Sequence, residues 1–186
     1  MKPSKIEAQF QPTDDKKCAA GENGMVATAF PEATQAGVEI LEKGGNAIDA
    51  ACAAAFALGV CEPQASGIGG QSTAIMHVDG KTIAIDGSSR VPSLAHIEQF
   101  NNKSERAIGY RATTVPSTVA VIGHLNFRYG KLKWLDILQP AIRIAREGYR
   151  ITKLQCDLQA RELEKFLSVP SQSGATFPAF SYFSLT

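Results

Sequence analysis

The chain has 186 residues, and its 19 Lys and Arg against 18 Asp and Glu give a formal net charge of +1 at neutral pH. Hydrophobic residues make up 44% and charged residues 20%, which is typical of a globular chain and gives no basis for nucleic-acid or membrane binding. The length suits one domain. Residues 1–24 are polar and lack the apolar stretch of a signal peptide, so we expect a cytoplasmic protein.

A first helix is predicted over residues 31–43. Pro31 suits its first turn, Glu32 lies where the helix dipole favours a negative charge, and apolar residues recur on one face. Gly44 and Gly45 follow the last turn, and glycine can adopt the left-handed conformation that commonly ends a helix. We therefore expect a tight corner at this point.

A second helix is predicted over residues 47–60. Asn46 can cap it with its side-chain oxygen, and Asp49 falls in its first turn, on the favourable side of the dipole. The helix contains almost no polar group, but it is shorter than the ~20 residues of a membrane span, so we expect it to be buried between layers. Pro63 cannot continue the helix, which should end by Cys61.

A β-hairpin is predicted over residues 71–86, with a two-residue turn at Asp79-Gly80. A glycine loop, residues 67–70, precedes it. Loops that bind phosphate run from strand to helix, whereas this one runs from helix to strand and lacks the lysine of a P-loop. We favour glycines that allow close backbone approach over a phosphate site.

Three further helices are predicted over residues 118–129, 132–147 and 152–167. Pro140 falls inside the second of these and is expected to kink or restart it. Apolar residues at helical spacing along the same helix are interpreted as a stripe that faces the core. These residues are Trp134, Leu135, Leu138, Ile142 and Ala145.

Cysteines and histidines do not form a recognisable site in the sequence. The four cysteines are widely spaced, so metal binding is not expected, and those in the apolar helix should behave as small hydrophobes. They are Cys18, Cys52, Cys61 and Cys156. The histidines lie in a strand, in a short helix expected to begin near Ser93, and on an amphipathic segment, so we interpret each as ordinary rather than catalytic. They are His77, His96 and His124.

A series of short motifs follows one another in a recognisable order. They are Met25-Val26-Ala27, Pro31 to Thr34, Ala36-Gly37, Ile40-Leu41, Gly44 to Ala51, Glu62-Pro63, Ser66 to Gly70, Ala84-Ile85-Asp86, Val115 to Ala120, Tyr129-Gly130, Leu138 to Ala141 and Ala145 to Tyr149. Together they resemble the amino-terminal part of the large subunit of the γ-glutamyltranspeptidase family. We divide the chain accordingly into a polar segment 1–24, a family-like fragment 25–167 and an atypical tail 168–186.

The resemblance implies a helix-rich α+β fold, part of the αββα sandwich of the N-terminal-nucleophile hydrolases, with the hairpin near 71–86. Family members cut themselves to expose a threonine that uses its own α-amino group as base and forms an acyl-enzyme with a γ-glutamyl amide. Since the family places that threonine beyond Thr186, no catalytic residue, cofactor or metal is assigned here. The expected partner is a missing carboxy-terminal part or small subunit that carries the threonine, and the expected substrate is a small γ-glutamyl or other amide.

The loop after the hairpin departs from the family pattern. Typical transpeptidases carry an arginine two residues after the aspartate that matches Asp86, and it pairs bidentately with the α-carboxylate of the substrate. Here Ser88 stands at that place, Ser89 follows it, and the arginine comes two positions later as Arg90. We assign Ser88, Ser89 and Arg90 as substrate-binding candidates. The alternative for Arg90 is a plain surface or structural ion pair.

Three functions are left open by the sequence. The chain is the first part of a γ-glutamyltransferase or glutathione hydrolase, inactive without its other part; or it belongs to an acylase of the same architecture that acts on another amide, as Ser88 suggests. The third possibility is a catalytically inactive truncated or assembly subunit whose apolar surface requires a partner. A truncation, a frameshift and a split gene all fit the atypical tail.

Overall fold

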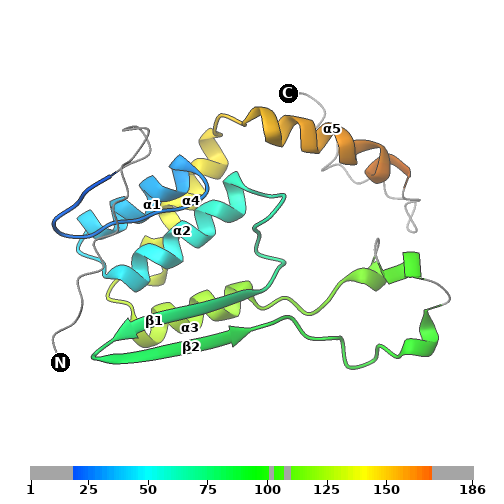
Figure 1. Ribbon diagram of the computed structural model, residues 1–186, viewed down its shortest axis with the longest axis horizontal. Coiled ribbons are helices and arrows are strands. Elements are labelled where there is room, and N and C mark those ends of the chain that lie inside the picture. Colours follow the sequence, from blue (N-terminus) through cyan, green and yellow to red (C-terminus); the bar gives the residue numbers. More distant parts are fainter. Residues whose placement is uncertain (1–18, 101–102, 107–109, 169–186) are drawn as a thin grey trace, which may run out of the picture.

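The computed structural model describes residues 19–100, 103–106 and 110–168. Its elements are α1 (Pro31–Glu42), α2 (Ala47–Cys61), β1 (Ser72–Val78), β2 (Lys81–Gly87), the short 3₁₀ helices η2 (Ile97–Gln99), η3 (Lys103–Arg106) and η4 (Tyr110–Ala112), then α3 (Thr118–Tyr129), α4 (Trp134–Glu147) and α5 (Lys153–Ser168). Figure 1 shows α1, α2 and α4 grouped together, α3 against the β1–β2 hairpin, and α5 and the 3₁₀ segment extending away from both. The five longer predicted helices and the hairpin are all present, with ends shifted by at most two residues.

Glycine ends α1 as the sequence predicts. Gly44 has a φ of +87°, its N–H donates to the carbonyl of Leu41 (2.9 Å), and the N–H of Gly45 donates to the carbonyl of Ile40 (3.0 Å). These two bonds form a Schellman motif, which satisfies the last carbonyls of the helix. A Cβ at Gly45 would lie 2.8 Å from both Cγ2 and the carbonyl oxygen of Ile40, so no side chain fits there.

The start of α2 is a reciprocal capping box. The side-chain oxygen of Asn46 accepts hydrogen bonds from the N–H groups of Ile48 and Asp49, both at 3.0 Å, and the Asp49 carboxylate accepts one from the N–H of Asn46 at 3.1 Å. Both residues thus satisfy backbone donors that an uncapped helix leaves unpaired. The predicted cap is confirmed.

Asp49 also joins this corner to a distant loop, which the sequence did not predict. Its side chain is fully buried. One carboxylate oxygen accepts from the N–H groups of Lys131 (2.8 Å) and Leu132 (3.2 Å), and the other accepts from the side-chain amide of Asn126 (3.0 Å). The side-chain amide of Asn46 donates to the carbonyl of Tyr129 at 2.6 Å, across the same interface. A buried carboxylate is therefore stabilised here by N–H donors that hold the α3–α4 loop.

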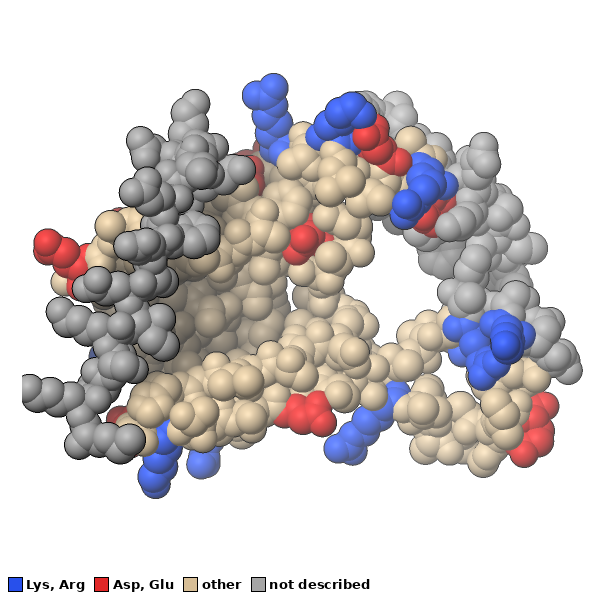
Figure 2. Space-filling view, viewed as in Figure 1, with Lys and Arg blue, Asp and Glu red and all other residues tan. Residues whose placement is uncertain are grey.

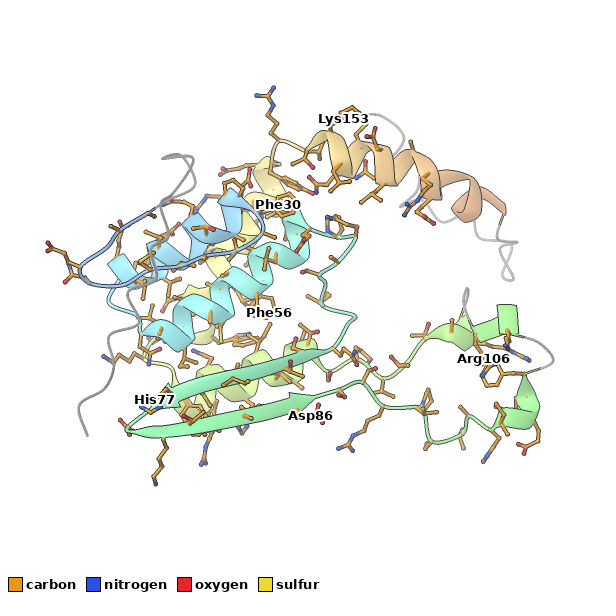
Figure 3. All side chains as sticks on the ribbon, viewed as in Figure 1. Phe30, Phe56, His77, Asp86, Arg106 and Lys153 are labelled. Carbon is orange, nitrogen blue, oxygen red and sulfur yellow. The ribbon has the colours of Figure 1, made fainter. Side chains whose placement is uncertain are left out.

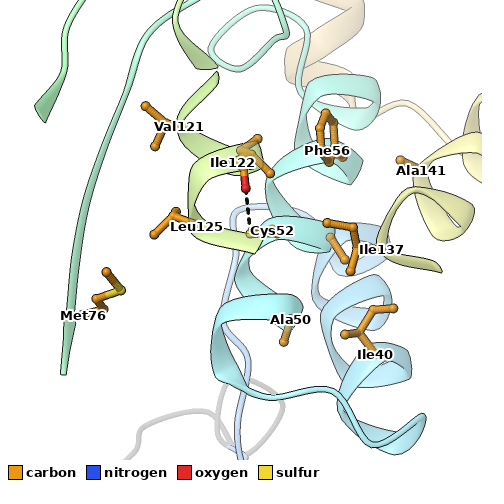
Figure 4. Close-up of a cluster of buried hydrophobic side chains, with 11 residues drawn as sticks. Ile40, Ala50, Cys52, Phe56, Met76, Val121, Ile122, Leu125, Ile137 and Ala141 are labelled. Carbon is orange, nitrogen blue, oxygen red and sulfur yellow. Dashed lines mark hydrogen bonds between the residues drawn. The ribbon is translucent and has the colours of Figure 1, made fainter. Parts of the chain in front are cut away.

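The hydrophobic core lies between α2, the hairpin and helices α1, α3 and α4, and Figure 4 shows its side chains meeting around α2. Its buried members are Ile40, Ala50, Cys52, Ala53, Phe56, Met76, Val121, Ile122, Leu125, Ile137 and Ala141. The expectation that α2 is buried is confirmed for eight of its fifteen residues, whereas Ala47 and Ala51 are exposed, so the helix is not buried on every side. Burial raises the pKa of Cys52 to about 12 and of Cys61 to about 11, so both thiols stay protonated and act as small apolar side chains. Cys18 lies outside the described residues, and Cys156 is exposed.

The apolar stripe predicted for α4 is confirmed only in part: Leu138 packs against the core, and Trp134 packs edge-on against Phe56 with ring centroids 5.4 Å apart. The side chains that α4 buries are Ile137, Pro140 and Ala141, whereas Leu135 is 61% exposed and Ala145 is also exposed. The helix carries two adjacent apolar stripes, and packing against α2 selects the one that contains Ile137. The helix also runs through Pro140 without restarting, contrary to that part of the prediction.

The hairpin is antiparallel, with Ser72 opposite Gly87 and Val78 opposite Lys81. Asp79 (φ 51°) and Gly80 (φ 72°) both take positive φ angles, as a type I′ turn requires. Met76 points into the core, while Ile75 on the opposite face is 81% exposed. The predicted strands and turn are confirmed, and one face of the hairpin is uncovered in the described part of the chain.

Helix α5 is anchored at its amino end. Thr152 and Gln155 cap it reciprocally, and the buried Gln155 amide donates to the carbonyl of Cys61 at 2.6 Å. The short helix expected near Ser93 begins later than predicted, since η2 spans Ile97–Gln99 and His96 precedes it.

Charged side chains of both signs are interspersed on the face that Figure 2 shows. No helix among the described residues is long and apolar enough to cross a bilayer. Nor do three His, Cys, Asp or Glu side chains come together as a metal site in this part of the chain. The polar segment 1–24 falls mostly, and the tail 168–186 almost entirely, outside the described residues.

Candidate functional site

An open cavity of about 340 Å³ lies where the end of β2 meets the first turns of α3. Its walls combine apolar side chains with a few polar and charged ones. The lining residues are Ile85, Asp86, Gly87, Ser88, Arg90, Val115, Pro116, Ser117, Ala120, Val121 and His124. Figure 3 shows Asp86 near the end of β2, on the side from which the chain continues to the 3₁₀ segment. A small pocket with apolar walls and a few convergent polar groups is the usual form of a ligand site.

The backbone on both sides of the cavity is held together by hydrogen bonds. Arg90 and Val115 form an isolated antiparallel bridge, in which the Val115 N–H donates to the Arg90 carbonyl (2.8 Å) and the Arg90 N–H to the Val115 carbonyl (3.3 Å). The Ser117 hydroxyl donates to the carbonyl of Gly87. A Cβ at Gly87 would lie 2.1 Å from Cγ2 of Val121, so only glycine lets the strand end pass so close to α3. The positions of Ser88 and Arg90 therefore depend on contacts made about 30 residues later in the sequence.

The glycine loop caps α3. The carbonyl of Gly70 accepts hydrogen bonds from the N–H groups of Ser117 (3.0 Å) and Thr118 (3.3 Å), which lie at the start of that helix. Ser117 makes no side-chain cap, because its hydroxyl is bonded to Gly87. The prediction that these glycines are needed for close backbone approach is not supported: a Cβ at Gly70 would lie at ordinary contact distances of 3.5 and 3.7 Å, and one at Gly67 or Gly69 would meet nothing within 4 Å.

Ser88 is engaged with Asp86. The N–H and the hydroxyl of Ser88 both donate to one carboxylate oxygen of Asp86, at 2.9 Å and 2.6 Å. These bonds, the hydroxyl first and the N–H second, lower the pKa of Asp86. Ser88 lines the cavity, but its hydroxyl proton is already donated. In this arrangement Ser88 offers a ligand an acceptor rather than a donor.

Ser89 and Arg90 differ in whether their side-chain hydrogen-bond donors are already used. Ser89 donates through its N–H (3.0 Å) and its hydroxyl (3.2 Å) to the side-chain oxygen of Gln71, and it does not line the cavity. Arg90 lines the cavity, is exposed, and forms no side-chain hydrogen bond or ion pair with a described residue. Of the three candidate residues, the fold brings Ser88 and Arg90 together, and Arg90 has its donors available. The structural ion pair considered for Arg90 is not formed with any described residue.

Sequence reasoning missed three residues that shape the site. Gln71 positions Ser89, Ser117 holds Gly87, and His124 lines the cavity from the second turn of α3. Its ring also packs edge-on against Tyr129, with centroids 6.4 Å apart. The chain carried no local signal for these roles, because the cavity exists only once α3 has packed against β2.

A family model described as γ-glutamyltranspeptidase matches residues 33–183. The chain belongs to the γ-glutamyltranspeptidase family. The family resemblance of its sequence motifs is thereby confirmed. The match covers the whole of the described cavity, all of α2 and all but the first two residues of α1.

The curated relatives that the chain resembles carry different names. The chain is 39% identical over 153 residues to "Acylase ACY 1 proenzyme" of Pseudomonas sp. (strain SE83), which covers 75% of the chain and 27% of that protein. It is 34% identical over 174 residues to "Glutathione hydrolase proenzyme" of Bacillus subtilis (strain 168), covering 88% of the chain and 29% of that protein. The chain thus spans less than a third of the length of these curated relatives.

The fold also matches solved structures of the family. The γ-glutamyltranspeptidase of Helicobacter pylori superposes with a TM-score of 0.77 at 35% identity, covering 83% of this chain and 46% of that one. The fold class predicted from the sequence, a helix-rich α+β part of the N-terminal-nucleophile hydrolase fold with a β-hairpin, is confirmed.

Proposed function

We propose that this chain is the amino-terminal part of a γ-glutamyltransferase or glutathione hydrolase. In the complete protein, a threonine outside this chain attacks a γ-glutamyl amide, forms an acyl-enzyme, and passes the acyl group to water or an amino acid. The chain supplies part of the substrate pocket and no nucleophile. Family membership and the relative named glutathione hydrolase support this assignment.

The observation that carries the proposal is the unpaired guanidinium of Arg90 in the cavity next to Ser88. A guanidinium can bind a carboxylate through two parallel hydrogen bonds, and this geometry suits the α-carboxylate of a γ-glutamyl group. Arg90 has no described partner that competes for those donors. It is therefore our candidate for the arginine that most family members carry two positions earlier.

A related acylase is the second candidate, and the state of Ser88 favours it. Its hydroxyl donates to Asp86, so the position that carries arginine in typical transpeptidases has neither a positive charge nor a spare donor here. A relative at 39% identity is named Acylase ACY 1 proenzyme, which supports this candidate. In that case the substrate is an amide with a different acyl group.

Substitutions in the complete enzyme separate the two candidates. The enzyme is assembled from this chain and the polypeptide that carries the threonine, and hydrolysis of a γ-glutamyl anilide is compared with that of an anilide without the α-carboxylate. Arg90→Ala should raise KM for the γ-glutamyl anilide by about tenfold or more, since a charge-assisted hydrogen bond contributes ~1.5–3 kcal/mol. Ser88→Arg should lower the same KM. The matched control is Arg128→Ala, an exposed arginine on α3 that does not line the cavity.

The outcomes distinguish the candidates as follows. A KM effect of Arg90→Ala restricted to the γ-glutamyl substrate supports the transferase or hydrolase. No effect from either substitution contradicts recognition of the α-carboxylate by this loop and favours the acylase. The 186-residue chain alone, used as the blank, is expected to release no amine from either anilide.

A further inference from the structure

Two side chains of opposite charge line the cavity, Asp86 near the end of β2 and Arg90 in the bridge to Val115. Both side chains are exposed, and neither forms an ion pair with a described residue. The two charges therefore face one cavity without neutralising each other. Each of them is available to a ligand.

One oxygen of the Asp86 carboxylate is free of hydrogen bonds from the described residues. The N–H and the hydroxyl of Ser88 both donate to Oδ1, at 2.9 Å and 2.6 Å, whereas Oδ2 accepts none. These bonds, the hydroxyl first and the N–H second, lower the pKa of Asp86, so the group is ionised at neutral pH. Oδ2 is thus a negatively charged acceptor at the cavity wall, and Oδ1 holds it in position.

The arrangement of the two charges suits a ligand that carries both signs. Asp86 and Arg90 are four positions apart, so their Cα atoms lie at most about 14 Å from each other. An α-amino acid group has an ammonium and a carboxylate on a single carbon. Its carboxylate can accept two hydrogen bonds from the guanidinium while its ammonium donates one to Asp86. A ligand with the carboxylate alone brings a second negative charge next to Asp86, which is unfavourable.

We propose that Asp86 binds the α-ammonium group of the substrate, and that it thereby selects an acyl group that is an α-amino acid over one that ends in a carboxylate alone. Arg90 binds the carboxylate, and Oδ2 of Asp86 accepts a hydrogen bond from the ammonium. Apolar side chains, among them Ile85, Val115 and Val121, surround the methylene groups of the ligand. This inference rests on the proposed γ-glutamyl amide substrate and adds a residue that distinguishes it from the acyl groups of the alternative acylase.

The test compares three small amides with similar carbon chains. L-Glutamine carries both the α-ammonium and the α-carboxylate, glutaramate lacks the ammonium, and γ-aminobutyramide lacks the carboxylate. Dissociation constants for the full 186-residue chain are measured by NMR titration at neutral pH. We expect L-glutamine to bind about two- to fivefold more tightly than glutaramate, the range that an exposed charge pair provides.

The decisive variant is Asp86→Asn, which removes the charge but keeps a side-chain oxygen for the two bonds from Ser88. It should bind L-glutamine and glutaramate with equal affinity, and it should bind γ-aminobutyramide about two- to fivefold more weakly than the unmodified chain does. If Asp86 only held the loop in place, its replacement would change the affinities for L-glutamine and glutaramate by the same factor, and the preference would remain.

The matched control is Asp79→Asn. Asp79 is exposed, lies in the turn at the other end of the hairpin, and has a positive φ, which asparagine also adopts. This variant should keep the preference for L-glutamine.

The outcomes separate failure of this inference from failure of the proposed function. The inference about Asp86 is wrong if Asp86→Asn keeps the preference, if Asp79→Asn loses it, or if the unmodified chain binds glutaramate as tightly as L-glutamine. In those cases the proposed function stands as long as Arg90→Ala weakens the binding of L-glutamine. If Asp86→Asn loses the preference but Arg90→Ala leaves all three affinities unchanged, the role of Asp86 stands and the proposed carboxylate contact of Arg90 is wrong. Absence of binding of all three amides by the unmodified chain overturns both.

Discussion

Replacing the buried Asp49 should destabilise the protein more than any exposed acidic residue. In Asp49→Ala, four donors lose their acceptor: the N–H groups of Asn46, Lys131 and Leu132 and the side-chain amide of Asn126. A hydrogen bond to a charged group contributes ~1.5–3 kcal/mol. If water enters and satisfies two of the four donors, the remaining two still give a loss of about 3 kcal/mol. For a chain of this size, that lowers Tm by roughly 6–12 °C.

Asp136 provides a matched control. It occupies the third position of α4, as Asp49 does of α2, but it is exposed and makes no side-chain hydrogen bond with a described residue. Its replacement by alanine should cost no more than ~1 kcal/mol, the contribution of a charge near a helix terminus. Both variants are measured by urea denaturation followed by circular dichroism, with Asp49→Asn as a milder change in case Asp49→Ala does not fold. Equal midpoints for Asp49→Ala and Asp136→Ala would refute the assignment of Asp49 as the link between the two regions.

Two other contacts give further predictions. Gly45→Val should lower the denaturation midpoint more than Asn46→Ala, because a side chain at Gly45 overlaps the end of α1. Asn46→Ala removes only the helix cap, which costs ~0.5–2 kcal/mol of stability. The reverse order of the two midpoints would contradict the described corner. Arg143 first and then Lys43 lower the pKa of Glu39 to about 2, so the stabilisation they provide is present above about pH 5 and is lost as the pH falls toward 2. Because these ion pairs lie near the surface, Glu39→Gln should remove at most ~1 kcal/mol of the pH-dependent stability. Denaturation curves at several pH values measure this loss, and equal acid sensitivity of the unmodified protein and Glu39→Gln would exclude the contribution.

Local signals account for the parts of the fold that could be predicted. Gly44 and Asn46 act on their immediate neighbours, so the end of one helix and the start of the next follow from residues within a few positions. The type I′ turn at Asp79-Gly80 is local in the same way. In each case the chemistry of two or three adjacent residues determines the backbone.

Long-range packing accounts for what the sequence did not provide. Asp49 could be placed in the first turn of a helix, but its bonds to Lys131 and Leu132 join positions 82 and 83 residues apart. On α4 both apolar stripes have helical spacing, and only contact with α2 decides between Leu135 and Ile137.

The contacts of the candidate site also include one that is local in the sequence and others that depend on long-range packing. The bond from Ser88 to Asp86 spans two residues, a spacing typical of aspartate in a turn, and was accessible from the sequence. The approach of His124 to the end of β2 was not, because it depends on how α3 packs against the hairpin. A single sequence therefore identified Ser88 and Arg90 as candidates but not the side chains that α3 contributes to the cavity.

The bridge between Arg90 and Val115 holds together the two ends of the segment 91–114. The entropic cost of bringing the ends of a flexible loop together rises only weakly with its length, by about 0.6 kcal/mol for each doubling. Since the bridge and the bond from Ser117 to Gly87 fix the ends independently of what lies between them, this segment can be exchanged between relatives with little effect on the core. Changes in the length or sequence of residues 91–114 can in this way leave in place the cavity wall that Ser88, Arg90 and Val115 form.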